Sequence, residues 1–166
     1  MIKKTTYYLL LLLTITGCAQ EAEDTIRLMP EGYQGPVLII FNQKYGTPKE
    51  YEGDKRLYRI PENGILRTQF GPNYGMQKHQ FFYVDNEGNR TEIPFLVVNT
   101  NEATKEIEPN KLYTYFERAI SESFGINAKG EEYSIPPART FYVGSLQDID
   151  KEHQELLNFT FKHHHN

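Results

Sequence analysis

The single thiol of the chain belongs to Cys18, which follows Gly17 at the end of an uncharged, largely apolar stretch. Lys3 and Lys4 precede that stretch. A basic start, an apolar centre and small residues before a cleavage point are typical of a secretory signal peptide, here residues 1–17. A membrane-spanning helix needs about 20 apolar residues, and this stretch is too short to be one. Because the chain has no second cysteine, Cys18 cannot form an intrachain disulfide.

The stretch Ile15-Thr16-Gly17-Cys18 resembles the lipobox of bacterial lipoproteins, in which an aliphatic residue and two small residues precede a cysteine. The resemblance implies that the Cys18 thiol receives a diacylglyceryl group and that the chain is cut between Gly17 and Cys18. It also implies that the new amine takes an acyl chain such as palmitate. One acyl chain binds a bilayer with a constant of only about 10⁴ M⁻¹, whereas two or more attach a protein stably. The alternative is an ordinary signal peptide with an unrelated cysteine.

The expected location is the cell envelope, with the membrane as a partner through the lipid anchor. Ala19 follows the cysteine, whereas an aspartate at that position is associated with retention in the inner membrane. The resemblance therefore implies the outer membrane in a cell with two membranes. In a cell with one membrane it implies the outer face of the plasma membrane.

Other residues with metal or catalytic chemistry are scattered. His79 and His153 stand alone, and the run at 163–166 contains the only histidine cluster, which we interpret as a solvated tail. The alternating acids at 148–152 resemble calcium-loop ligands, but the loop's glycine and its terminal bidentate glutamate are missing, so the start of a helix explains them better. No nucleophile elbow or phosphate-binding loop appears. We predict no catalytic residue, no metal site and no cofactor.

Five tyrosines remain as candidates for stacking on a sugar or a peptide: Tyr74, Tyr83, Tyr113, Tyr115 and Tyr142. The alternative, which we favour, is that they fill the core of a chain that has no tryptophan. Aromatic side chains are large, and they are enriched in pleated, half-buried strands.

Length and charge bound the remaining possibilities. We divide the chain into a signal peptide (1–17), a lipidated N-terminus and tether (18–25), a single β-rich domain (26–162) and the histidine-rich tail (163–166). A domain of this size can fold without disulfides. The net charge of −4 gives no electrostatic reason to bind nucleic acid.

The sequence pattern of the first half of the domain predicts strands and turns. We expect strands at 26–29 and at 37–41, the second an uninterrupted apolar run that suits burial on both faces. Residues 56–60 and 65–70 flank Asn63-Gly64 and predict a hairpin, because Asn-Gly accepts positive φ. A second hairpin is predicted for 81–85 and 90–95, extended by 96–98.

The second half is less regular. The apolar residues of 112–124 fit both the spacing of a helix face and the alternation of a strand. The aromatic content favours a strand over a helix. Strands are expected at 133–135 and 140–143, a helix at 148–157 with Asp148 as N-cap, and a closing strand at 158–161. The predicted fold is mainly β: an antiparallel β-sandwich or small barrel with one short C-terminal helix.

Four motifs of the domain resemble those of a family of small bacterial lipoproteins that carry a domain of unknown function. The motifs are Pro30-Glu31-Gly32-Tyr33-x-Gly35, Tyr58-x-Ile60-Pro61-x-Asn63-Gly64-Ile65-Leu66-x-Thr68, Phe82-Tyr83-Val84-Asp85 and Phe141-Tyr142-Val143-Gly144. The resemblance covers most of residues 26–145. Its motifs are turns and strands, so it implies a fold and transfers no catalytic or ligand residue.

Taken together, the sequence predicts a lipid-anchored envelope protein that acts as a non-catalytic binding or structural module. Its partner would be an envelope protein or a glycan. The alternative is an envelope enzyme, or an enzyme inhibitor, that acts on peptide or glycan with a site built from Tyr, Asp and Glu side chains.

Overall fold

The computed structural model describes residues 22–98, 107–108, 110–126 and 129–164. The signal peptide and the lipobox therefore lie outside the described residues. The strands are β1 (Thr25–Pro30), β2 (Gly35–Ile40), β3 (Glu50–Glu52), β4 (Lys55–Arg59), β5 (Ile65–Arg67), β6 (His79–Val84), β7 (Arg90–Glu92), β8 (Tyr113–Ile120), β9 (Ser123–Ile126), β10 (Glu132–Ile135) and β11 (Ala138–Gly144), and the helix is α2 (Ile149–His164).

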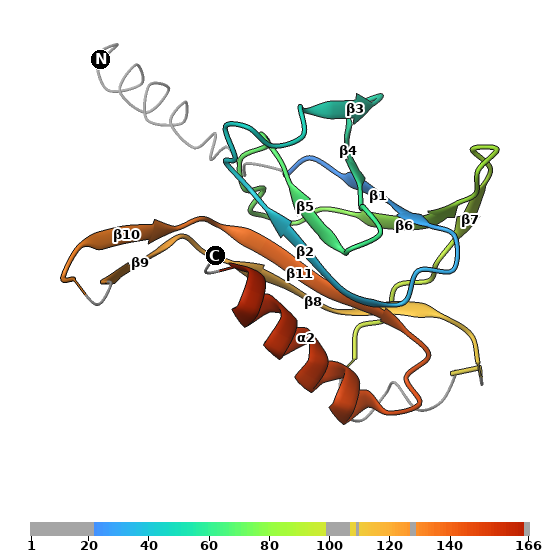
Figure 1. The fold of residues 1–166 in the computed structure, drawn as a ribbon. Helices are drawn as coiled ribbons and strands as arrows, with labels where there is room; N and C mark the ends of the chain where they lie inside the picture. The colour runs from blue at the N-terminus through green and yellow to red at the C-terminus, as the bar shows by residue number, and fades with distance from the viewer. Residues whose placement is uncertain (1–21, 99–106, 109, 127–128, 165–166) are drawn as a thin grey trace, which may run out of the picture.

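Two sheets pack face to face, and the helix covers the outer side of one of them (Figure 1). Sheet A has the strand order β3-β4-β1-β6-β7, and sheet B has the order β5-β2-β11-β8. The β9–β10 hairpin continues β8 and β11 outward from sheet B. The mainly β fold with a C-terminal helix confirms the predicted fold class, and the described strands form no closed barrel. The sheets are mixed, because β1 runs parallel to β4 and β6, and β2 runs parallel to β5.

Strand β2 is buried on both faces, as its apolar run predicts. Val37 and Ile39 face sheet A within the main core, whereas Leu38 and Ile40 face the helix. Alternation along a strand produces this division. Together the two faces give sheet B a continuous apolar centre between sheet A and α2.

The predicted hairpin around Asn63-Gly64 is wrong. The turn itself forms, since Gly64 has φ 74° and its N–H donates to the carbonyl of Pro61 at 2.9 Å. However, β4 belongs to sheet A and β5 to sheet B, where β5 pairs in parallel with β2. The turn carries the chain from one sheet to the other, because the apolar side chains of β5 are buried best beside β2.

The second predicted hairpin is confirmed, with β6 and β7 antiparallel across residues 82–92. The expected extension through 96–98 is wrong. Pro94 cannot donate to a ladder, and the chain then crosses to sheet B, where Leu96 N–H donates to the carbonyl of Thr114. The strand interpretation of 112–124 is confirmed by β8 and β9.

The helix begins as predicted, with an Asp148 oxygen accepting from the Lys151 N–H at 3.3 Å. It runs on to residue 164, so the expected closing strand at 158–161 is wrong. His164 is buried rather than solvated, and its Nε2 lies 2.6 Å from the carbonyl of Pro136. The reason is packing: Leu156 and Phe159, three residues apart, both contact sheet B. Among the described residues, no helix has the length and hydropathy needed to cross a bilayer.

Candidate functional site

Arg27 lies in the middle of the core with no exposed surface. Its neighbours Ile26 and Leu28 belong to an apolar cluster on the outer side of sheet A, so alternation turns Arg27 towards sheet B. Taking a charge out of water costs several kcal/mol unless a partner of opposite charge is supplied. The burial of Arg27 therefore requires compensating groups from the opposite sheet.

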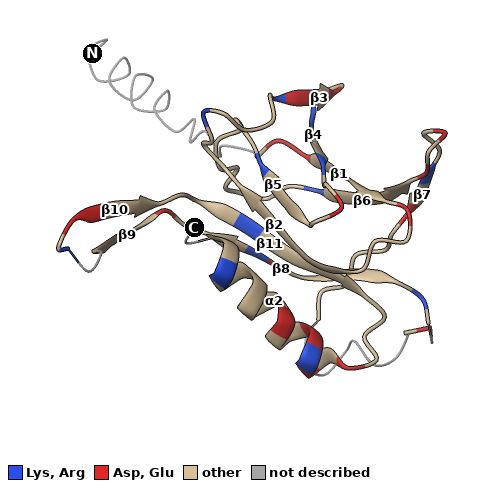
Figure 2. Cartoon of the chain, viewed as in Figure 1, with Lys and Arg blue, Asp and Glu red and all other residues tan. Residues whose placement is uncertain are grey.

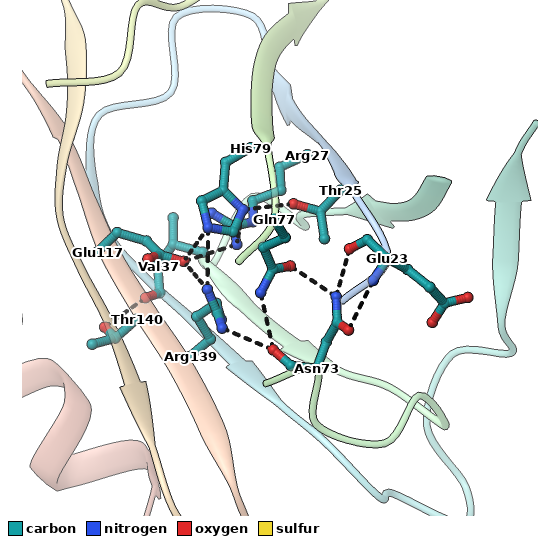
Figure 3. A network of polar contacts seen from close by, with 10 residues as sticks. All are labelled: Glu23, Thr25, Arg27, Val37, Asn73, Gln77, His79, Glu117, Arg139 and Thr140. Carbon is teal, nitrogen blue, oxygen red and sulfur yellow. Dashed lines mark hydrogen bonds and ion pairs between the residues drawn. The ribbon is translucent and has the colours of Figure 1, made fainter. Parts of the chain in front are cut away.

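Those groups come from β6, β8 and β11, and we call Arg27, His79, Glu117 and Arg139 the inter-sheet charge cluster. Oε1 of Glu117 accepts hydrogen bonds from Nη2 of Arg27 at 3.0 Å and from Nη1 of Arg139 at 2.5 Å. The same oxygen lies 3.4 Å from Nε2 of His79. Figure 3 shows the carboxylate where both guanidinium groups and the imidazole meet. One carboxylate thus links β1 and β6 of sheet A to β11 of sheet B.

A β-bulge turns Glu117 towards the cluster. Tyr115 pairs with Tyr142 on the side of sheet B that faces the helix, and the register with β11 then shifts between Thr140 and Tyr142. Phe116 stands at the shift with φ 55°, a conformation that bulky residues rarely adopt. The bulge adds one residue to β8, and the side chains after it point to the opposite face of sheet B from the one that simple alternation would give. Glu117 therefore points at sheet A instead of α2.

Aromatic rings enclose the rest of the Arg27 side chain. Its guanidinium carbon lies 4.8 Å from the ring centre of Phe81 in sheet A and 5.1 Å from that of Phe141 in sheet B. Nε and Nη1 have no hydrogen-bond acceptor among the described residues. Cation–π attraction, worth about 2 kcal/mol when desolvated, compensates part of this burial.

The two titratable members of the cluster are held in fixed charge states. Burial, followed by the charge of Arg27, lowers the pKa of His79 to about 4 against the opposing effect of Glu117. Burial raises the pKa of Glu117, but the charges of Arg27 and Arg139 and the hydrogen bond from Arg139 outweigh it, so this pKa lies below its ordinary value. Two guanidinium cations and one carboxylate therefore leave a net charge of +1 at neutral pH.

The contacts of His79 agree with a neutral ring. Nδ1 lies 2.9 Å from Oγ1 of Thr25 and 3.3 Å from Nη2 of Arg27, and Nε2 lies 3.3 Å from Nη1 of Arg139. Arginine can only donate, so each ring nitrogen faces a cationic donor, and a second proton on the ring is disfavoured. A general acid or base works best with a pKa near the operating pH, and neither His79 nor Glu117 meets that condition near pH 7. The cluster is arranged to join the sheets.

The cluster also holds the chain just before β1. Nη2 of Arg139 donates to the carbonyl of Asn73 at 3.1 Å. The Asn73 amide pairs with the backbone of Glu23, donating to its carbonyl at 2.6 Å and accepting from its N–H at 3.2 Å, as Figure 3 shows. Nε of Arg56 donates to the Glu23 carboxylate at 2.5 Å. These hydrogen bonds hold Glu23 against the edge of the domain.

A second feature is a groove between α2 and the second half of β8. Its volume is about 630 Å³, and its apolar lining includes Phe116, Ile120, Leu156, Leu157 and Phe161. Leu157 and Phe161 are 40% and 73% exposed. Such exposure on a helix that otherwise packs against sheet B makes this groove a candidate surface for contact with another molecule.

Four of the five candidate tyrosines are buried or half-buried, and only Tyr74 is exposed. Tyr113, Tyr115 and Tyr142 share one buried cluster with Leu156 of the helix. Tyr83 is half-buried, and its hydroxyl donates to the carbonyl of Tyr33. The favoured interpretation, that these rings fill the core, is confirmed for the four. Tyr74 is 53% exposed and lies apart from them.

Sequence reasoning missed the inter-sheet charge cluster. His79 looked isolated, and the four members lie on separate strands at widely spaced positions. One signal was available: Arg27 occupies an otherwise apolar strand, between Ile26 and Leu28. Of the residues predicted for lipidation and cleavage, Gly17 and Cys18 lie outside the described residues. Within the described ranges, no three His, Cys, Asp or Glu side chains gather where they could hold a metal ion.

A family model described as a family of unknown function, DUF6843, matches residues 21–125. The chain belongs to this family. The DUF6843 match includes Arg27, His79 and Glu117, and it ends before Arg139. It also ends before the fourth motif of the predicted resemblance, at 141–144.

A crystal structure described as a "putative lipoprotein" from Bacillus anthracis is similar to this DUF6843 protein with a TM-score of 0.49 and 16% sequence identity. The similarity covers 88% of this chain and 99% of that one. No curated protein matches the chain.

Proposed function

We propose that this DUF6843 protein is a lipid-anchored protein of the cell envelope, and that its domain is a non-catalytic binding or structural module. The observation that carries the proposal is the sequence before the domain, where Ile15-Thr16-Gly17-Cys18 ends an apolar stretch that follows a basic start. The ordered domain supports it, because β1 begins at Thr25, only a few residues after Cys18.

The charge states of the core support a non-catalytic role. A buried carboxylate with a raised pKa would favour an enzyme, since it could donate a proton near neutral pH. Glu117 has the opposite shift, and both guanidinium groups engage it. The exposed side chains of Leu157 and Phe161 favour contact with another molecule of the envelope, a protein or a glycan.

The anchor is tested by labelling growing cells with an alkyne analogue of palmitate and capturing the protein. We expect label on the wild-type protein and none on the Cys18→Ser variant. The matched control is Thr16→Ser, which keeps a small residue at that position and should be labelled like the wild type. Label on Cys18→Ser, or none on the wild type, would show that the proposal is wrong.

A further inference from the structure

The end of the sandwich at which β1 begins is also the end from which the β9–β10 hairpin projects. Strand β1 starts at Thr25, beside His79 at the start of β6. In sheet B, β11 starts at Ala138, which pairs with Ile120 at the end of β8, and the hairpin lies between these two strands in the chain. Arg139 reaches from there to Asn73. Figure 1 shows the hairpin leaving the body on the side where β1 starts. We call this the anchor-proximal end, formed by loops 42–49 and 71–78 and the hairpin.

The chain before β1 limits how far this end can lie from Cys18. Glu23 is fastened to the domain through Asn73 and Arg56. Five residue steps separate Cys18 from Glu23, and a fully extended chain spans at most about 3.3–3.6 Å per residue, or roughly 17 Å here. A lipid on Cys18 would therefore hold the anchor-proximal end close to the bilayer surface.

Exposed apolar side chains gather at this same end. In the loops, Tyr45 is 92% exposed, Tyr74 53% and Met76 94%. On the hairpin, Phe124 is 74% exposed and Ile126 70%. Among the residues that the structure describes, the turns at the opposite end contain no large hydrophobic residue of comparable exposure. They carry acidic residues, which Figure 2 marks at the β6–β7 turn and the first turns of α2.

The hairpin presents its apolar residues on one face. Phe124 stands opposite Ser134 and Ile126 opposite Glu132, so both apolar side chains point the same way. Tyr133 covers Gly125 on the other face, where an added Cβ would lie 2.5 Å from the tyrosine ring. The ring leaves no room for a side chain at Gly125 and keeps the two faces distinct.

We propose that the anchor-proximal end rests on the lipid bilayer, with Phe124 and Ile126 at the boundary between headgroups and acyl chains. This inference depends on the proposed lipid anchor at Cys18. Tyrosine rings are enriched at the headgroup level of membranes, which suits Tyr45 and Tyr74. Surface-bound elements bury their apolar face about 5–10 Å into that boundary. The loops and the hairpin carry similar numbers of lysines (Lys44, Lys49, Lys78 and Lys129) and glutamates (Glu122, Glu131 and Glu132), so the proposed contact rests on the apolar side chains, and uncharged phosphatidylcholine vesicles test it directly.

The chain has no tryptophan, so one introduced indole reports its own surroundings. The lipidated Phe124→Trp variant is reconstituted into phosphatidylcholine vesicles, with and without lipids brominated near the headgroup end of the acyl chain. The control is Glu87→Trp, at the β6–β7 turn on the opposite end. Because an interfacial side chain lies within the boundary region, we expect about threefold or greater bromine quenching of Phe124→Trp relative to the control. Ile126→Trp repeats the test at an independent site.

Equal quenching of Phe124→Trp and Glu87→Trp would overturn the bilayer contact. So would a blue-shifted Phe124→Trp emission that bromine leaves unquenched, because that result indicates a protein partner or a second copy of the chain. Flotation of the same vesicles distinguishes a failure of the bilayer contact from a failure of the lipid anchor. Protein that floats without selective quenching refutes the contact and leaves the anchor standing, whereas protein that fails to float and lacks lipid on Cys18 refutes the anchor.

Discussion

Glu117→Gln tests whether one carboxylate holds the two sheets together. The change keeps the size of the side chain and removes the negative charge that Arg27 and Arg139 share. The side chains of Arg27, Arg139 and Glu117 are 0%, 10% and 12% exposed, so solvent screens the interaction weakly. Breaking a buried pair by removing one partner costs about 3–5 kcal/mol. A domain of this size loses about 2–4 °C in Tm per kcal/mol, so we expect a fall of roughly 10 °C.

The assay is thermal and urea unfolding of the full-length protein in detergent, followed by circular dichroism. The matched control is Glu50→Gln, which removes the partner of Arg59 from an exposed ion pair whose side chains are 42% and 56% exposed. Exposed pairs contribute about 0–1 kcal/mol, so this variant should unfold close to the wild type.

A double-variant cycle asks whether the loss comes from the charge pair itself. Replacing Arg27 by Met removes the buried cation, so Arg27→Met with Glu117→Gln should cost less than the sum of the two single changes. Equal losses for Glu117→Gln and Glu50→Gln, or strict additivity in the cycle, would show that the Glu117 carboxylate does not hold the two sheets together.

Two further predictions concern pH and backbone conformation. The pKa of His79 falls from 6.5 to about 4 on folding, so between those values the unfolded chain binds a proton that the folded chain does not. The free energy of unfolding should fall as pH drops from 6.5 to 4, and His79→Gln should flatten that decline by roughly 1–2 kcal/mol in urea titrations; an unchanged slope would contradict this. Gly64→Ala would place a Cβ 2.5 Å from the carbonyl oxygen of Pro36 at a φ of 74°, whereas Gly53 has φ 63° with open space around it. We expect Gly64→Ala to cost about 2 kcal/mol or more and Gly53→Ala about 1 kcal/mol, and equal shifts in Tm would show that the contact does not matter.

The parts of the fold that could be predicted are those determined by local pattern. The apolar run at 37–41, the β6–β7 turn and the Asp148 cap each depend on residues within a few positions of one another. Turn chemistry also located the bend at Gly64 correctly. It could not tell which strand β5 would join, because that choice depends on burial beside β2, far away in the sequence.

The helix shows how tertiary packing overrides local pattern. Phe159 and Phe161 alternate as in a strand, and this alternation predicts a closing strand. The side of sheet B that carries Leu38 and Ile40 still needs an apolar cover. A helix supplies it through Leu156 and Phe159, which lie on one side when spaced by three residues.

The inter-sheet charge cluster depends on a bulge that no alternation pattern reveals. Strict period two places Glu117 on the same side as Tyr113 and Tyr115, facing the helix. The positive φ of Phe116 shifts the facing by one residue, and the carboxylate then meets Arg27. The sequence contains the charges, but the register that unites them exists only in the folded sheet.

The lipid anchor is tested most directly by the mass of the mature N-terminal peptide, taken from protein extracted from membranes. We expect a peptide that begins at Cys18 and carries the added mass of a diacylglyceryl group on the thiol. A mature chain that begins elsewhere, or that begins at Cys18 with a free thiol, would contradict it.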